Sequence, residues 1–167
     1  MAELTPKERL QPSLLDRLTD DAPDHNAESR ERRVLSPSQL RDCVRRDLAW
    51  LLNTTNLEST TPLNEVPYVA SSVLNFGVVD LAGKPVSSIN AGQLEKMIRD
   101  SIWTFEPRLI KDSVVVRIDE RKTGHNELSF VIEAQLWAQP LPIQLFLRTE
   151  IDLESGEVKV ADKEGGP

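Results

Sequence analysis

Apolar residues recur at helical spacing in the first half of the chain. Residues 36–39 read Ser-Pro-Ser-Gln, the form of a capping box, with Ser36 as the N-cap and Pro37 at the first helical position. The polar run at 53–56 predicts the end of this helix. Its apolar stripe comprises Leu40, Cys43, Val44, Leu48, Leu51 and Leu52.

Two further helices are predicted before the chain reaches Pro107. The first covers 67–76, with Pro67 near its start and Gly77 as its stop. The second begins near Ser88 or Asn90 and cannot continue far past Pro107, which lacks a backbone N–H. The apolar face of the first comprises Val69, Val73 and Phe76, and that of the second comprises Leu94, Met97, Ile98, Ile102 and Phe105.

From residue 113 onward the apolar period changes from helical to two, which is typical of half-buried strands. Turn signals at 123–126 and 154–156, and prolines at 140 and 142, separate the alternating segments. Sequential strands with short turns predict an antiparallel meander. Helices followed by a sheet predict an α+β fold, with N-terminal helices packed on a meander of about four strands. The strands are expected within 113–119, 128–137, 143–153 and 158–160.

A polar stretch at 19–33 separates a short apolar segment from the rest of the chain. Ser13 is placed to cap one helical turn that carries Leu14, Leu15 and Leu18 on one face. Because a single turn cannot hold itself in water, the leucines either fold back onto the core or dock on a partner. The predicted division is a partner-binding segment with its linker at 1–33, an α+β domain at 34–161 and a frayed tail at 162–167.

The chain of 167 residues has 20 basic and 27 acidic side chains, a net charge of −7. A net-acidic chain is a poor candidate for nucleic-acid binding, which depends on Lys and Arg at phosphates. The arginines at 30–33 and 41–46 are interleaved with acids, which favours a salt-bridged helix face over a nucleic-acid site. No apolar run approaches the ~18 residues of a membrane span, and the N-terminus lacks a signal peptide's apolar centre. We therefore expect a cytosolic protein.

The sequence gives little support for catalysis. His25 lies in the polar linker and His125 in a predicted hairpin turn, so both are expected to face solvent. Cys43 lies on an apolar stripe, where a free cysteine behaves as a small hydrophobe. With 27 acidic side chains, the sequence does not exclude the pair of carboxylates that glycoside hydrolysis needs. We expect no enzyme activity, no cofactor and no metal site. Core or core-edge positions are predicted for Trp50, Trp103 and Trp137, the last being the most exposed.

The most unusual local feature is the corner at 105–109, Phe-Glu-Pro-Arg-Leu. Pro107 ends the preceding helix and restricts Glu106 to extended geometry, so Glu106 and Arg108 flank a rigid corner between helix and sheet. In one interpretation the corner is structural, with Arg108 bound to helix-end carbonyls or to a carboxylate. In the other, the two charges are preset for a partner, and the planar guanidinium gives geometric specificity.

Four tracts together resemble the baseplate wedge family of contractile machines, which includes a phage wedge subunit once labelled lysozyme-like and the TssE subunit of type VI secretion systems. FEPRL at 105–109 and SVLNFGVVDLAG at 72–83 carry the family resemblance. PSLLDRL at 12–18 and LRDCVRRDLAWLLNT at 40–54 are similar to the TssE branch in particular. The one departure is at 78–79, where relatives often have a proline before the aspartate, and it concerns only the local turn.

This resemblance implies a structural subunit of a cytoplasmic baseplate that docks at the inner membrane complex. The implied wedge partners are TssF, TssG and TssK, and the sheath of TssB and TssC would begin to polymerise from this position, templated by a sheet edge. It implies sheath interaction through Glu106, Pro107 and Arg108. We expect Leu14, Leu15 and Leu18 to bind a wedge partner. The alternatives that stay open are a cell-wall glycosidase, as the old label suggests, and a soluble protein-binding adaptor.

Overall fold

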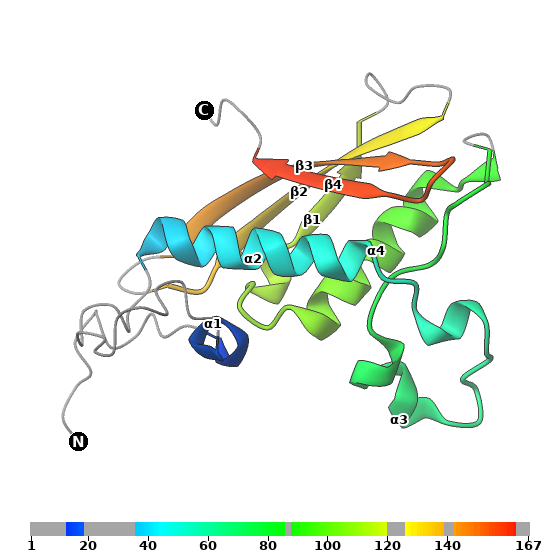
Figure 1. The fold of residues 1–167 in the computed structure, drawn as a ribbon, viewed down its shortest axis with the longest axis horizontal. Helices are drawn as coiled ribbons and strands as arrows, with labels where there is room; N and C mark the ends of the chain where they lie inside the picture. The colour runs from blue at the N-terminus through cyan, green and yellow to red at the C-terminus, as the bar shows by residue number, and fades with distance from the viewer. Residues whose placement is uncertain (1–12, 19–35, 86–87, 120–125, 139–141, 163–167) are drawn as a thin grey trace.

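The computed structural model describes residues 13–18, 36–85, 88–119, 126–138 and 142–162. Helices come first along the chain and a sheet follows, which confirms the α+β prediction (Figure 1). The predicted linker at 19–33 and both histidines, His25 and His125, lie outside the described residues. No helix in the described ranges has the length and apolar character needed to cross a membrane.

Helix α2, Pro37–Leu52, begins as its sequence predicts. The Gln39 backbone N–H donates to Ser36 Oγ over 3.2 Å, and the Ser36 N–H donates to Gln39 Oε1 over 2.8 Å, so both halves of the capping box are present. The helix ends at Leu52, with Asn53 as the C-cap. Local sequence therefore sets both ends of α2.

The helix predicted over 67–76 is wrong. The chain forms α3, Pro67–Ala70, and then a separate 3₁₀ turn, η4, Val73–Asn75. Ser72 causes the break, because its hydroxyl donates to the Val69 carbonyl and accepts the Leu74 N–H. A serine side chain that bonds nearby backbone in this way competes with helix formation. Val73, expected on an apolar face, is consequently exposed.

Helix α4, Ala91–Phe105, begins after Asn90, whose side chain accepts the Gln93 N–H over 3.0 Å. Its buried residues are Leu94, Ile98 and Ile102. Met97 was expected on the same stripe but is exposed. It precedes Ile98 by about 100° around the helix and falls at the margin of the buried arc.

The sheet comprises β1, Val115–Ile118, β2, Glu127–Leu136, β3, Ile143–Asp152, and β4, Val158–Asp162. The strand order is β1-β2-β3-β4 and every pair is antiparallel, so the predicted meander is confirmed. One row across the sheet aligns Val116, Ile132, Leu147 and Asp162. Strand β4 thus includes Asp162, the first residue of the segment expected to fray.

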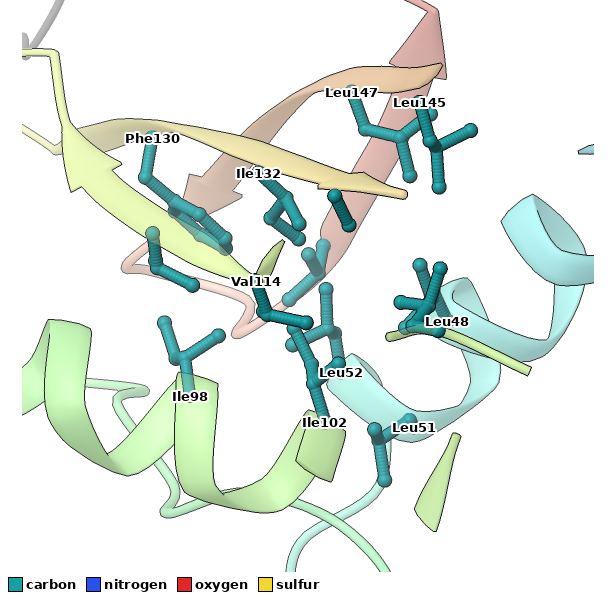
Figure 2. Packing of buried hydrophobic residues seen from close by; sticks show 14 of the residues in the cluster. Leu48, Leu51, Leu52, Ile98, Ile102, Val114, Phe130, Ile132, Leu145 and Leu147 are labelled. Atoms are coloured by element: carbon teal, nitrogen blue, oxygen red, sulfur yellow. The ribbon is translucent and has the colours of Figure 1, made fainter. Parts of the chain in front are cut away.

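The core lies between the sheet and helices α2 and α4, which cover one sheet face (Figure 1). Figure 2 shows leucines of α2 and isoleucines of α4 pointing toward the same group of sheet residues. The labelled residues are Leu48, Leu51, Leu52, Ile98, Ile102, Val114, Phe130, Ile132, Leu145 and Leu147, all of them buried. This layer fixes the positions of α2, α4 and the strand ends relative to one another.

The segment after η4 is held against the end of α2 at Gly77. The Val78 N–H donates to the Thr54 carbonyl over 2.8 Å, and the Asn56 N–H donates to the Val78 carbonyl over 3.0 Å. Gly77 has φ +127°, and a Cβ there would lie 2.2 Å from the Thr54 oxygen. Only glycine permits this close approach of two backbone segments.

Gly77→Ala is therefore expected to destabilise the protein more than Gly83→Ala. Gly83 also has a positive φ, +72°, but a Cβ there would meet no atom within 4 Å. The Gly83 variant should lose about 1 kcal/mol from backbone strain alone, and the Gly77 variant more than ~2 kcal/mol because it adds a clash. Urea unfolding of both variants measures the difference. Equal losses would contradict the close approach at Thr54.

Candidate partner-binding site at the helix–sheet corner

A tight turn joins α4 to the sheet at Glu106, Pro107, Arg108 and Leu109. The Leu109 N–H donates to the Glu106 carbonyl over 3.2 Å, with Pro107 at the second position of the turn, which suits its fixed φ. The turn is fastened to the end of β2, since Leu109 bridges Leu136. In addition, the Trp137 N–H donates to the Arg108 carbonyl over 2.8 Å. The predicted rigid corner is thus present.

Within this corner, Glu106 and Arg108 are paired with each other. Arg108 Nε donates to Glu106 Oε1 over 2.7 Å, and Nη2 donates to Oε2 over 2.5 Å. The Arg108 backbone N–H also donates to Oε1. Glu106 is only 4 % exposed, Arg108 is half-buried and Pro107 is exposed. The structure therefore contains the carboxylate contact of the structural interpretation; whether the corner also binds the sheath stays a prediction.

Two aspartates from elsewhere in the chain complete a charge cluster, defined as Asp16, Arg46, Asp47, Glu106 and Arg108. Asp47, on α2, accepts from Arg108 Nη2 over 2.5 Å and from Arg46 Nε over 2.9 Å. Asp16 accepts from Arg46 Nη2 over 2.7 Å, and its other oxygen lies 4.0 Å from Arg108 Nη1. Acids and arginines thus alternate through the cluster, which has one more acid than base.

Asp16 belongs to α1, Leu14–Leu18, a short helix that lies beside α2 on the side away from the sheet (Figure 1). The Ser13 hydroxyl and N–H both donate to Asp16 Oδ2, at 2.6 and 3.1 Å, and the Asp16 N–H donates to Ser13 Oγ. This is a capping box with an aspartate in the third helical position. The Asp16 side chain is only 6 % exposed. A charged contact therefore places α1 on the domain.

The leucines of α1 do not fold back onto the core. Leu14 is 71 % exposed, Leu15 44 % and Leu18 74 %. Burial of the leucines and attachment to a partner are the two alternatives that the amino-acid pattern leaves open. In the structure α1 docks through Asp16 and leaves the leucine face open. Binding of a wedge partner by Leu14, Leu15 and Leu18 stays a prediction.

The cluster shifts the pKa values of Asp16 and Arg108. Burial alone would raise the pKa of Asp16, but hydrogen bonds from Ser13 and Arg46 outweigh it and lower the pKa below 3.8. Burial would lower the pKa of Arg108, yet Glu106 and then Asp47 raise it well above its ordinary value. Because the pKa of Asp16 is lowered on folding, its stabilising contact is complete above pH 3.8 and is lost as the pH falls through the folded-state value.

Cys43 is half-buried and lies at the flank of the α2 stripe, so the prediction that it belongs to the buried stripe is wrong in this respect. Burial and a hydrogen bond with Asp16 raise the pKa of the Cys43 thiol from 9.0 to about 11. The thiolate is the reactive form of cysteine. Cys43 is therefore still expected to be unreactive toward thiol reagents, because of the neighbouring Asp16 carboxylate as well as its packing.

Trp50 and Arg45 on α2, and Trp137 after β2, can be compared with the expectations from the sequence. Trp50 was expected in the core or at its edge but is exposed, with the Arg46 guanidinium 4.9 Å from the centre of its ring. Trp137 is exposed, as predicted. Arg45 pairs with Asp42 over 3.1 Å, as expected for a salt-bridged helix face. Residues 30–33, the other part of the arginine-rich sequence, lie outside the described residues.

Sequence reasoning missed Asp16 and Asp47 as members of the site. For Asp16 a signal existed, since Ser13 followed three residues later by an acid is a capping-box pattern. No sequence signal exists for Asp47, because its partner Arg108 is 61 residues away along the chain. The oxygens of Asp47 and Glu106 are engaged by arginines. Among the residues that the structure describes, no three His, Cys, Asp or Glu side chains are grouped to hold a metal ion.

A family model described as baseplate wedge protein gp25 matches residues 38–141, which include α4, β1, β2, all of α2 except Pro37, and all of the charge cluster except Asp16. No curated protein and no solved structure matches the chain.

The contact between Asp16 and Cys43 provides a test of α1 docking. In the unaltered protein a thiol reagent at pH 8 is expected to label Cys43 slowly, because a pKa of about 11 leaves few thiolates. Asp16→Asn removes the anionic neighbour and should speed labelling about tenfold. Leu14→Ser, which changes an exposed residue of the same helix, is the control and should leave the rate unchanged. Equal rates for Asp16→Asn and the unaltered chain would contradict the docking contact.

Proposed function

Because the chain belongs to the baseplate wedge protein gp25 family, we propose that it is a non-enzymatic subunit of a type VI secretion baseplate wedge that connects the baseplate to the contractile sheath. The family is a structural one of the baseplate. The observation that carries the proposal is the match over residues 38–141, which contains the Glu106-Pro107-Arg108 corner. The proposed wedge partners are TssF, TssG and TssK, and the proposed sheath partners are TssB and TssC, in a cytoplasmic baseplate docked at the inner membrane complex.

We propose further that an edge of the sheet templates the first sheath strand. An edge strand presents unpaired N–H and C=O groups to which another strand can add. Hydrogen bonding in an antiparallel pair alternates along the strand. Asp152 N–H donates to the Glu157 carbonyl, so residues 159 and 161 of β4 face β3, whereas 158, 160 and 162 face outward. The same alternation turns 116 and 118 of β1 outward, because Asp119 N–H donates to the Ser129 carbonyl.

At one end of each edge strand, β4 and β1, a side chain bonds the outward backbone groups and so blocks strand addition there. Asn53 donates to the Val158 carbonyl over 2.8 Å and accepts the Val158 N–H over 2.9 Å, so its amide takes the place of a neighbouring strand. On β1, Glu95 Oε1 accepts the outward N–H of Ile118 over 2.8 Å. Within the described residues, the outward N–H and C=O of Val160 have no such partner. We therefore propose residues 160–162 of β4 as the acceptor of the sheath strand.

The corner would contribute through Arg108. Its Nη1 atom is buried and makes no hydrogen bond in the part of the chain that is described, and Asp16 Oδ2 lies 4.0 Å from it. The other guanidinium nitrogens are held by Glu106 and Asp47, so the orientation of Nη1 is set before a partner arrives. Pre-organisation lowers the ordering cost of binding. The exposed leucines of α1 would bind a wedge subunit on a different surface.

Substitution of Arg108 separates its structural role from its proposed contact. Arg108→Ala leaves Glu106 buried without its partner and should lose about 3 kcal/mol of stability. Arg108→Lys keeps the positive charge but lacks the planar fork. We expect the lysine variant to fold and enter the wedge, yet to start few sheaths. Folding, wedge incorporation and sheath formation are measured on the same variant.

Arg99→Lys is the matched control, because Arg99 is more exposed than Arg108 and pairs with Asp100 on the same helix, α4. It should leave all three measurements unchanged. An Arg108→Lys protein that folds, enters the wedge and starts sheaths at the normal frequency would refute a contact between Arg108 and the sheath. The contacts of Arg108 with Glu106 and Asp47 would then be its whole role.

Val160→Pro tests the proposed strand acceptor. Proline removes the outward N–H of Val160 without removing a hydrogen bond between β3 and β4. Val160→Ala is the control, because it loses the same packing but keeps the N–H. We expect sheath formation to fall at least tenfold in the proline variant relative to the alanine variant, with equal wedge incorporation. Equal sheath formation in the two variants would exclude this edge as the template.

A further inference from the structure

Residues 57–76 form a lobe that buries the polar side chain of Asn75 as well as Leu63, while three large side chains point outward. Tyr68 is 91 % exposed, Val73 82 % and Leu74 68 %, whereas Asn75 is 6 % exposed. Hydrophobic burial favours the opposite arrangement. None of the three exposed residues belongs to the hydrophobic core. Folding of the domain therefore gives no reason for these apolar residues to lie where they do.

The lobe is held in shape by Asn75. Its Oδ1 accepts the Glu58 N–H over 2.9 Å, and its Nδ2 donates to the Ala70 carbonyl over 3.0 Å. These two bonds tie the 3₁₀ turn η3, Leu57–Ser59, and the end of α3 to η4. Successive turn bonds, from Val69 to Val66 and from Ser72 to Val69, fix the backbone between them. The outward side chains are thus presented on an ordered backbone, which lowers the cost of binding.

The lobe projects from the helix layer on the side away from the sheet (Figure 1). This location separates it from both sheet edges. It is attached to the domain by the backbone contact at Gly77 and Thr54 and by Phe76, whose ring packs edge-on against that of Phe105. A partner bound to the lobe would leave the outward groups of β4 free for another strand.

Charge defines the kind of partner that fits. Between Asp47 and Lys84 the chain has no lysine or arginine. The charged side chains of the lobe are Glu58 and Glu65, and both are exposed. An apolar surface with only acidic charges at its rim is complementary to apolar side chains flanked by basic ones. Tyrosine is among the residues that contribute most at such interfaces.

We infer that the lobe is a docking surface for a segment of another wedge subunit whose apolar side chains are flanked by lysine or arginine. The inference rests on the proposed function only in taking the partner from the wedge. The apolar anchors would pack on Tyr68, Val73 and Leu74, and the basic residues would face Glu58 and Glu65. A second copy of this chain is the main competing occupant.

The test uses the full chain reconstituted with TssF and TssG of the same organism. A photo-crosslinking amino acid in place of Leu74 should form a crosslink to one of these subunits, in a peptide that has apolar residues flanked by Lys or Arg. The double variant Val73→Ser/Leu74→Ser should bind the TssF–TssG complex about tenfold more weakly than the unaltered chain. Met97→Ser is the control for loss of an exposed apolar side chain, and it should bind normally.

A second pair of variants tests the charge. Glu65→Lys should weaken binding about threefold and lessen its salt dependence, whereas Glu157→Lys makes the same charge change at an exposed turn and should do neither. Unchanged binding of the Val73/Leu74 variant, a crosslink to an acidic peptide, or lobe-dependent self-association of the chain alone would each overturn the inference. If the unaltered chain fails to bind TssF–TssG, the proposed function fails, and this inference fails with it.

Discussion

The ion pair between Arg108 and Glu106 is the interaction on which the geometry of the helix–sheet corner depends. Glu106 is almost fully buried, and a buried carboxylate is tolerated only when its partner and its hydrogen bonds are all in place. Arg108 meets both oxygens and also reaches Asp47 on α2. One guanidinium therefore fixes the end of α4, the turn into the sheet and the middle of α2. Removing it would leave a charge in the interior, which typically costs about 3–5 kcal/mol.

The same cluster explains how a five-residue helix is held. A helix as short as α1 has almost no stability of its own. Asp16 attaches α1 to α2. Arg46, which is oriented by its bond to Asp47, donates a further hydrogen bond to the Asp16 carboxylate. The contact does not require the leucines, which stay on the outer face of the helix. Charge pairing thus positions α1 while Leu14 and Leu18 stay exposed.

How far the sequence could predict the structure depends on how local each determinant is. The ends of α2 follow from Ser36, Gln39 and the polar residues after Leu52, all within a few positions, and they were predicted correctly. The helix expected over 67–76 failed because one hydroxyl, that of Ser72, bonds the backbone instead of solvent. The corner was predicted from Pro107, but the partner of Arg108 on α2 was not. Nothing in a single sequence links positions 47 and 108.

The side chains that bond the outward backbone groups of β4 and β1 limit where a partner strand can add to the sheet. Asn53 closes β4 at Val158 and Glu95 closes β1 at Ile118. The register places Val158 opposite Ile151 and hence in line with Leu128, near the start of β2, whereas Asp162 lies in line with Ile132. The uncovered part of β4 is thus nearer the end of β2, where Leu136 bridges the corner residue Leu109. A strand added there would meet the sheet toward the end at which Arg108 is fixed. Because exposed edges otherwise invite pairing along their whole length, closing one end limits both the position and the register of an added strand.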